Sequence, residues 1–134
     1  MAVVTLCLDT NILIDHLKGR EPGSRALSRA LREYRCGITV ITAYEVLYGM
    51  ARSRRSIGEE ALTDALPTLP MDKQAAGVAA HLHAELIHRN QDIGVKDTLI
   101  AAICLRYSVP ILTANAKHFS RVDSLVVIDP ANWT

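Results

Sequence analysis

Apolar positions along the chain fall into short runs that alternate with helical patterns. Runs at residues 3–8, 37–41, 109–113 and 125–128 are rich in apolar and β-branched residues, which is typical of strands buried on both faces. A weaker run at 69–71 indicates an edge strand. Helical periodicity predicts helices over residues 12–17, 25–34, 42–53, 59–66, 73–88 and 97–105. This alternation predicts an α/β fold, an α/β/α sandwich with a mainly parallel sheet of four to five strands.

The length of the chain indicates one domain, and its net charge limits the classes of partner. At 134 residues the chain fits a single domain spanning 1–134, and its formal net charge of +1 argues against a protein that coats polyanions. Met1 leads directly into a strand without a basic leader, and no apolar run approaches the roughly 20 residues of a membrane span. The three cysteines lie in apolar segments without C-x-x-C spacing. We therefore expect a cytoplasmic protein with reduced thiols and no membrane contact.

Polar residues that can carry chemistry recur where strands end and helices begin. Asp9 follows the first strand, Glu45 lies in the first turn of the helix after the second strand, and Asn115 lies just past the strand at 109–113. Because the carboxyl ends of parallel strands share one edge of a sheet, we expect these three side chains to meet there. Asp97 starts a buried helix whose amino end can face the same edge.

Each acid also has a purely structural explanation. Asp9 can cap the helix that follows it, and Glu45 completes a T-x-x-E capping box that begins at Thr42. Asp97 can likewise stabilise the first turn of its helix. A shared site explains with one assumption why Asp9, Glu45 and Asp97 all lie at the same edge of the sheet. Capping must instead be assumed separately for each of the three acids.

Converging carboxylates need a cation. Without one they repel each other and their pKa values rise. Mg²⁺, or Mn²⁺ in its place, prefers carboxylate, carbonyl and water oxygens, whereas His81, His83 and His88 are not spaced to share one helix face as zinc ligands. A carboxylate-held Mg²⁺ can deprotonate water and offset charge on a phosphate, so the pattern predicts phosphodiester hydrolysis.

Four segments together resemble a known family. They are LDTNILI at 8–14, ITAYEVLYG at 41–49, DTLIAA at 97–102, and LTAN at 112–115 followed by HF at 118–119. Their order and spacing resemble the PIN-domain ribonucleases, and within them the VapC-type toxins of type II toxin–antitoxin systems. The resemblance covers essentially the whole chain. It implies a PIN-like fold and a Mg²⁺-dependent endoribonuclease that leaves a 5′-phosphate and a 3′-hydroxyl.

The resemblance also implies residue roles. Asp9, Glu45 and Asp97 take the positions of the catalytic, metal-binding acids, and Asn115 takes the fourth catalytic position. This fourth block departs from the family, because Asn115 and His118 stand where many relatives carry aspartate. The fourth position is therefore neutral unless Asp92 or Asp123 substitutes, and a site with three acids suits one tightly held Mg²⁺.

Other residues are candidates for supporting the site. Asn11 and Thr113 can hold the acids in place, although local turn bonds explain both equally simply. A basic cluster at Arg52, Arg54 and Arg55 is a candidate for binding RNA phosphates. The arginines of the helix at 25–34 form either a solvated face or a second phosphate-binding face.

Partners follow from the resemblance. It implies a VapB-type antitoxin that binds as a peptide over the cleft, for which we expect an apolar groove at Ile14, Leu17, Leu47 and Tyr48. It also implies a homodimer, which we place on the small-residue helix around residues 76–84. The main alternative is a catalytically weak PIN-fold module that binds RNA or an antitoxin. A phospho-acceptor receiver domain lacks a suitable lysine, and a dinucleotide-binding fold is excluded because no Gly-rich loop follows the first strand.

Overall fold

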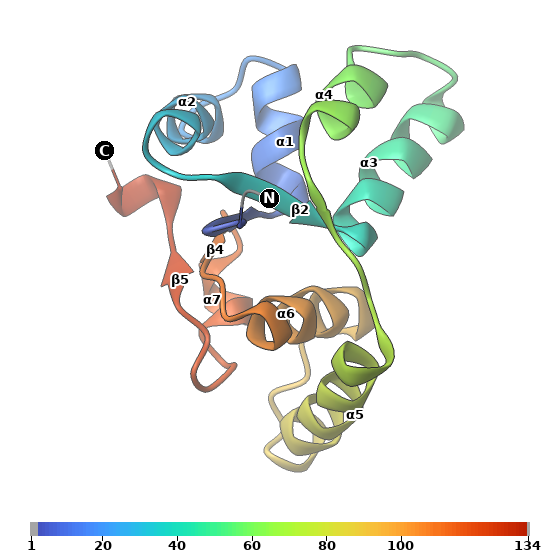
Figure 1. The fold of residues 1–134 in the computed structure, drawn as a ribbon, viewed down its shortest axis with the longest axis vertical. Helices are drawn as coiled ribbons and strands as arrows, with labels where there is room; N and C mark the ends of the chain where they lie inside the picture. The colour runs from blue at the N-terminus through green and yellow to red at the C-terminus, as the bar shows by residue number, and fades with distance from the viewer. Residues whose placement is uncertain (1–2, 134) are drawn as a thin grey trace.

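The computed structural model describes residues 3–133 and contains one parallel sheet flanked by helices (Figure 1). The strands are β1 (Leu6–Leu8), β2 (Cys36–Thr39), β3 (Thr68–Leu69), β4 (Ile111–Leu112) and β5 (Val127–Ile128). The helices are α1 (Thr10–Leu17), α2 (Gly23–Glu33), α3 (Val40–Ser53), α4 (Glu59–Ala65), α5 (Lys73–His88), α6 (Val95–Tyr107) and α7 (Ala116–Phe119), with a 3₁₀ turn at Pro130–Asn132. The predicted α/β/α sandwich is confirmed. Of the expected span 1–134, residues 1, 2 and 134 lie outside the described part.

Two apolar cores sandwich the sheet. Leu6 and Leu8 of β1 face a core shared with α1, α2 and Val46 of α3, whereas Cys7 faces the opposite core, shared with α5, α6 and Phe119. This follows from the alternation of side chains along a strand. Figure 1 shows the first four helices on one side of the sheet and α5, α6 and α7 on the other.

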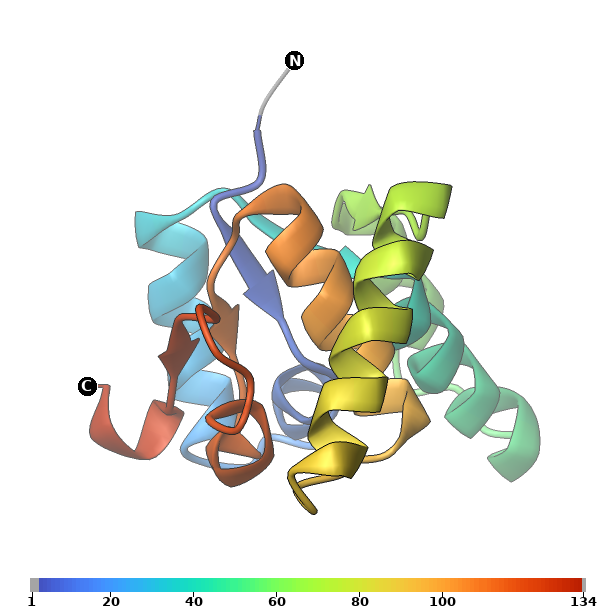
Figure 2. The ribbon, with the colours of Figure 1, turned by 90° about the horizontal axis from the view of Figure 1, so that it is seen from below.

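The order of the strands defines one edge as the place for a site. The sheet order is β3-β2-β1-β4-β5 and every pair is parallel. The chain extends the sheet from β1 towards β3 and then crosses over to β4 and β5. A topological switch point therefore lies between β1 and β4, and ligands bind beyond the carboxyl ends of strands at such points. In Figure 2 β1 points towards the start of α1, at the end away from the N-terminus.

The start of α3 corrects one prediction. Thr39, the last residue of β2, caps the helix, and its Oγ1 accepts a hydrogen bond of 3.1 Å from the backbone N–H of Thr42. The proposed capping box with Thr42 as the cap is wrong, because β2 ends earlier than expected and Thr42 already lies inside the helix. Glu45 therefore lies in the second turn, where capping no longer explains it.

Most other boundaries agree with the pattern. α5 begins at Lys73 and is capped by Asp72, whose Oδ1 accepts a hydrogen bond of 2.8 Å from Ala75 N–H. β1 is shorter than the run at 3–8, and α6 begins at Val95, two residues before Asp97. Cys7, Cys36 and Cys104 are buried free thiols. No helix within residues 3–133 has the length and apolar character needed to cross a membrane.

Candidate active site

Asp9 lies at the switch point, immediately after β1, and only 3% of it is exposed. Its Oδ1 accepts a hydrogen bond of 2.8 Å from Thr10 N–H, so it does cap α1. Its Oδ2 accepts hydrogen bonds from Thr113 Oγ1 at 2.7 Å and from Asn11 Nδ2 at 3.2 Å. The capping and site explanations therefore hold together, and both predicted supporting residues contact Asp9.

The environment of Asp9 is unfavourable to its charge. The pKa of Asp9 is raised to about 6, chiefly by burial and to a smaller extent by the nearby charges of Asp97 and Glu45, against the lowering effect of its hydrogen bonds from Thr113 and Thr10. A buried carboxylate beside two others is the electrostatic condition that a bound cation relieves.

Glu45 reaches the same region from α3. Its Oε1 accepts a hydrogen bond of 2.6 Å from Thr10 Oγ1, which ties the start of α1 to α3. Its Oε2 lies 3.5 Å from Lys96 Nζ, but the Lys96 side chain is 63% exposed. An ion pair this exposed contributes little stability, so Lys96 can leave Glu45 when another cation arrives.

Asp97 and Asn115 contact each other at the same cavity. Asp97 lies in the first turn of α6, and its Oδ2 accepts a hydrogen bond of 3.2 Å from Asn115 Nδ2. Asn115 precedes α7, and its backbone N–H donates to Thr113 Oγ1 at 2.9 Å. His118 Nδ1 also lies 3.1 Å from Asp97 Oδ2. The sequence showed His118 only as a departure from a pattern, with no indication of this contact.

One cavity of about 430 Å³ collects these groups. Its lining residues are Asp9, Thr10, Asn11, Ile14, Asp15, Arg20, Glu45, Asp97 and Asn115. The structure thus brings together all four predicted catalytic residues, whereas Thr113 lies buried behind Asp9. Arg20 was missed by the sequence analysis because it lies in the loop after α1, where periodicity gives no signal.

The donors in this cavity fit a hard divalent cation. They are carboxylate oxygens and an amide oxygen, the ligands that Mg²⁺ takes while keeping several waters. Among the residues that the structure describes, no group of three or more His, Cys, Asp or Glu side chains is arranged to hold a metal ion as it stands.

The predicted basic cluster lies beside this cavity, in a separate groove. Arg52 and Arg55 line a hollow of about 440 Å³ that also contains Val46 and Ile57, and Ile14 lines both this groove and the acidic cavity. Arg54 is the C-terminal cap of α3. Neither Arg52 nor Arg55 lines the cavity that holds the acids.

The predicted apolar groove needs correction at three of its four residues. Ile14 lines the groove, but Leu17, Leu47 and Tyr48 do not. On α3 the face towards the groove carries Val46, Gly49, Met50 and Ser53, and Leu47 and Tyr48 are rotated away from it by the 3.6-residue repeat of the helix. Tyr48 instead stacks on Tyr44 at the surface, with ring centroids 5.8 Å apart.

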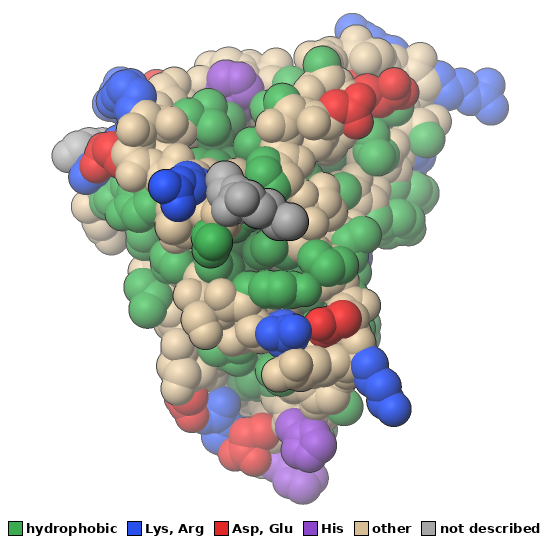
Figure 3. Space-filling view, viewed as in Figure 1, with side chains coloured by type: hydrophobic (Ala, Val, Ile, Leu, Met, Phe, Trp, Pro, Cys, Tyr) green, Lys and Arg blue, Asp and Glu red, His purple; other side chains and the backbone are tan. Residues whose placement is uncertain are grey.

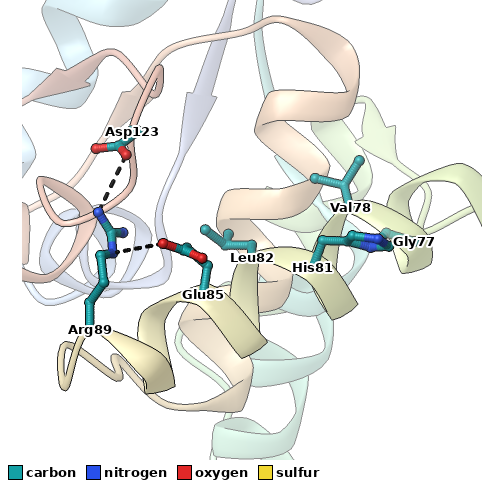
Figure 4. A pocket seen from close by; sticks show the side chains of 7 residues that line it. All are labelled: Gly77, Val78, His81, Leu82, Glu85, Arg89 and Asp123. Carbon is teal, nitrogen blue, oxygen red and sulfur yellow. Dashed lines mark hydrogen bonds and ion pairs between the residues drawn. The ribbon is translucent and has the colours of Figure 1, made fainter.

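Another hollow, of about 650 Å³, lies elsewhere, along α5 (Figure 4). Arg89 on its wall pairs with Glu85 at 3.8 Å and with Asp123 at 3.3 Å. One arginine is thus shared between two carboxylates, and none of the four predicted catalytic residues lies there. This hollow is separate from the candidate active site.

Comparison with known proteins identifies the class. The PIN domain model matches residues 6–125. The chain is 32% identical over 130 residues to "Ribonuclease VapC" of Rickettsia bellii (strain RML369-C), covering 92% of this chain and 94% of that protein. It is 30% identical over 122 residues to the "tRNA(fMet)-specific endonuclease VapC" of Shigella flexneri, covering 88% and 92%. The chain therefore belongs to the PIN domain family, as a VapC-type member.

Solved structures agree with this assignment. The crystal structure of DNA-bound VapBC from Salmonella typhimurium matches with a TM-score of 0.81 at 26% identity, covering 96% of this chain and 99% of that one. VapBC-1 from nontypeable Haemophilus influenzae matches with a TM-score of 0.80, also at 26% identity and with the same coverage. The predicted family and fold are confirmed.

Proposed function

We propose that this chain is a metal-dependent endoribonuclease toxin that a VapB-type antitoxin neutralises. The observation that carries the proposal is the cavity at the switch point, where Asp9, Glu45, Asp97 and Asn115 meet. The names of the VapC relatives, ribonuclease and tRNA endonuclease, support the same reaction class.

In this proposal Asp9, Glu45 and Asp97 hold Mg²⁺, with Mn²⁺ as a substitute. The ion supplies a water of lowered pKa and offsets negative charge on the scissile phosphate. The residues of the chain keep the acids in position: Thr113 and Asn11 hold Asp9 in place. Hydrolysis by water leaves a 5′-phosphate and a 3′-hydroxyl.

Binding of RNA rests on cations near the cavity. Arg20 lines the cavity itself and has no carboxylate within ion-pair distance among the described residues, so it is placed to meet a phosphate beside the acids. Arg52 and Arg55 extend positive charge along the neighbouring groove, and Arg54 lies between them in the chain as the C-terminal cap of α3. Contacts of this kind give affinity and register without reading bases.

The groove also suits the antitoxin. It combines apolar walls at Ile14, Val46 and Ile57 with basic residues, and it shares Ile14 with the acidic cavity. A peptide in the groove therefore lies next to the acids. The matching solved structures of VapBC support an antitoxin as the partner class.

We further propose that residues 1–134 form a single domain. We also propose that two copies of this domain form a homodimer through α5. The exposed positions Ala76, Ala80 and Ala84 recur every four residues and form a flat strip on this helix. Figure 3 shows histidine and acidic side chains grouped at the end of the molecule where α5 lies. Small side chains allow a second copy to approach closely.

The decisive experiment is cleavage of a mixed pool of structured RNA with Mg²⁺, Mn²⁺ or EDTA. Wild type is compared with Asp97→Asn and with Asp64→Asn, which changes an exposed acid of α4 that does not line the cavity. We expect discrete cuts that need metal, persist in Asp64→Asn and vanish in Asp97→Asn. Sequencing the new 5′-phosphate ends identifies the target.

The alternative function is that of a binding module. Folded protein, freed of any co-purified partner, would then cut nothing under all three conditions and would bind RNA with equal affinity in Mg²⁺ and EDTA. The neutral fourth position at Asn115 is the observation that favours this alternative. That outcome would overturn the nuclease proposal, and Asn115→Asp would be the first variant to make.

A further inference from the structure

Three side chains form a tight triangle at the wall of the acidic cavity. Oδ2 of Asp97 lies 3.2 Å from Asn115 Nδ2 and 3.1 Å from His118 Nδ1, and these two nitrogens lie 2.9 Å apart. His118 belongs to α7, which Phe119, fully buried in the core beneath α6, holds in place. The position of the imidazole is therefore fixed by packing as well as by its polar contacts.

The chemistry of the triangle assigns its protons. A carboxylate oxygen can only accept, so the amide of Asn115 donates through Nδ2. An unprotonated Nδ1 could accept from Asn115 Nδ2 at 2.9 Å, but its lone pair would also face a carboxylate oxygen 3.1 Å away, which is repulsive. A proton on Nδ1 brings two N–H donors close together but lets the imidazole donate to the charged oxygen of Asp97, and a hydrogen bond to a charged acceptor is the stronger one. Two N–H groups then converge on Oδ2.

This arrangement leaves one carboxylate oxygen of Asp97 available to bind a cation. With two donors on Oδ2, that atom has no remaining capacity for a strong ligand bond. Oδ1 accepts no side-chain hydrogen bond from the described residues. Since Asp97 lines the cavity, Oδ1 is the oxygen available to a cation.

We propose that His118 is a positioning residue for the metal site: Nδ1–H holds Asp97 Oδ2, so that Asp97 presents Oδ1 alone to the ion. This inference rests on the proposed metal-dependent function and adds a residue to it. Outer partners of metal ligands commonly change metal affinity by about 10- to 100-fold when they are removed.

The test uses three variants at position 118 and Mn²⁺ as the probe. Binding is measured by electron paramagnetic resonance, and the melting temperature is measured in EDTA. Asparagine places an amide N–H where Nδ1 lies, whereas glutamine places it where Nε2 lies. We expect His118→Ala to weaken Mn²⁺ binding about 10-fold, His118→Asn to restore it to within about threefold, and His118→Gln to resemble alanine.

A matched control separates this role from a general structural one. His83 on α5 also pairs with an aspartate, Asp92 at 3.5 Å, and its side chain is about as exposed as that of His118. His83→Ala should leave Mn²⁺ affinity unchanged. The melting temperature in EDTA should vary little across the His118 variants, because the His118 side chain is 39% exposed and an exposed contact of this kind contributes little stability.

A spectroscopic readout tests the proton assignment directly. Nitrogen-15 NMR of the wild type in EDTA should show His118 protonated at Nδ1, and Asp97→Asn should remove that preference. Wild-type affinity in His118→Ala, rescue by glutamine equal to that by asparagine, or an unprotonated Nδ1 would each overturn the inference. Failure of the wild type to bind Mn²⁺ would instead overturn the proposed metal dependence, and this inference with it.

Discussion

The hydroxyl of Thr113 donates a 2.7 Å hydrogen bond to Oδ2 of Asp9, across 104 positions of sequence. The two residues follow neighbouring parallel strands, and a backbone bond of 3.0 Å from Asp9 N–H to Leu112 C=O runs beside the contact. A buried carboxylate is tolerated only when it is hydrogen-bonded or neutralised. Thr113 is thus the partner that allows Asp9 to remain inside the protein as a reactive group.

Removing that hydroxyl should destabilise the protein most when Asp9 is charged. Thr113→Val keeps the shape of the side chain but leaves Asp9 Oδ2 and Asn115 N–H without this partner. We expect a loss of about 2 kcal/mol in unfolding free energy at pH 8, measured by urea denaturation in EDTA. The loss should shrink at pH 4.5, where Asp9 is protonated.

The serine variant provides the control. Thr113→Ser retains the hydroxyl and loses only a methyl group, so it should lose less stability than Thr113→Val at pH 8. If both variants lost the same unfolding free energy, or if the loss in Thr113→Val did not depend on pH, the loss would come from packing and not from the hydrogen bond to Asp9.

Asp9 should also shape the pH dependence of stability without metal. Folding raises its pKa from 3.8 to about 6. The folded chain then binds the proton more tightly, so the stabilisation is fully present below 3.8 and is lost as the pH rises through 6. We expect wild type to lose on the order of 3 kcal/mol of unfolding free energy from this group between pH 4 and pH 8 in EDTA.

Asp9→Asn isolates that contribution. Its unfolding free energy should change less over the same range, because the raised carboxyl is absent. Adding Mg²⁺ at pH 8 should raise the melting temperature of the wild type and leave Asp9→Asn nearly unchanged, since an ion that binds only the folded state stabilises it. Parallel pH curves for the two proteins would contradict the raised pKa.

Arg20 should contribute to RNA affinity from within the cavity. In an Asp97→Asn background, which prevents cutting, Arg20→Gln should weaken RNA binding and reduce the slope of log affinity against log salt by about one. The matched change Arg35→Gln lies near Thr5, at the amino edge of the sheet, and should alter neither quantity. Equal effects of both variants would point to net charge alone.

The basic cluster of the groove can be tested in the same assay. Replacing Arg52, Arg54 and Arg55 together with glutamine should reduce the salt slope by about two, because single-stranded RNA yields slightly less than one unit per phosphate contact. Mn²⁺ affinity should remain at the wild-type value, since these residues lie outside the acidic cavity. An unchanged salt slope would assign the cluster to the antitoxin alone.

The strip of alanines on α5 should govern assembly. Ala80→Arg places a long charged side chain in the strip, and we expect light scattering to show a monomer in place of the wild-type dimer. Gln74→Arg, an exposed change on another face of the same helix, should leave the mass unchanged. A wild-type protein that is monomeric at all concentrations would rule out this dimer.

The sequence predicted the fold and most of the site because both depend on local patterns. Buried strands show as apolar runs, and parallel pairing gathers whatever follows their carboxyl ends, which placed Asp9 and Asn115 correctly. The sequence also placed Glu45 near this edge, but it offered a capping box as a competing explanation. That explanation arose because the pattern placed the end of β2 two residues too late, whereas the residue that caps α3 is Thr39.

What the sequence could not supply are contacts between loops. Arg20 and His118 reach the acids through the loop after α1 and the short helix α7, and neither segment has a periodic pattern. Which side chains of α3 face the groove depends on where the helix begins. If the predicted start is wrong by two residues, the expected direction of each side chain is wrong by about half a turn, which is why Leu47 and Tyr48 were expected in the groove.

The bond between Thr113 and Asp9 has a consequence for how the protein is made. During synthesis Asp9 emerges 104 residues before Thr113, whose hydroxyl holds it, and before β4, the strand that pairs beside β1. A nascent chain therefore carries Asp9 without this partner until Thr113 has been made. The site is assembled only when both segments are present.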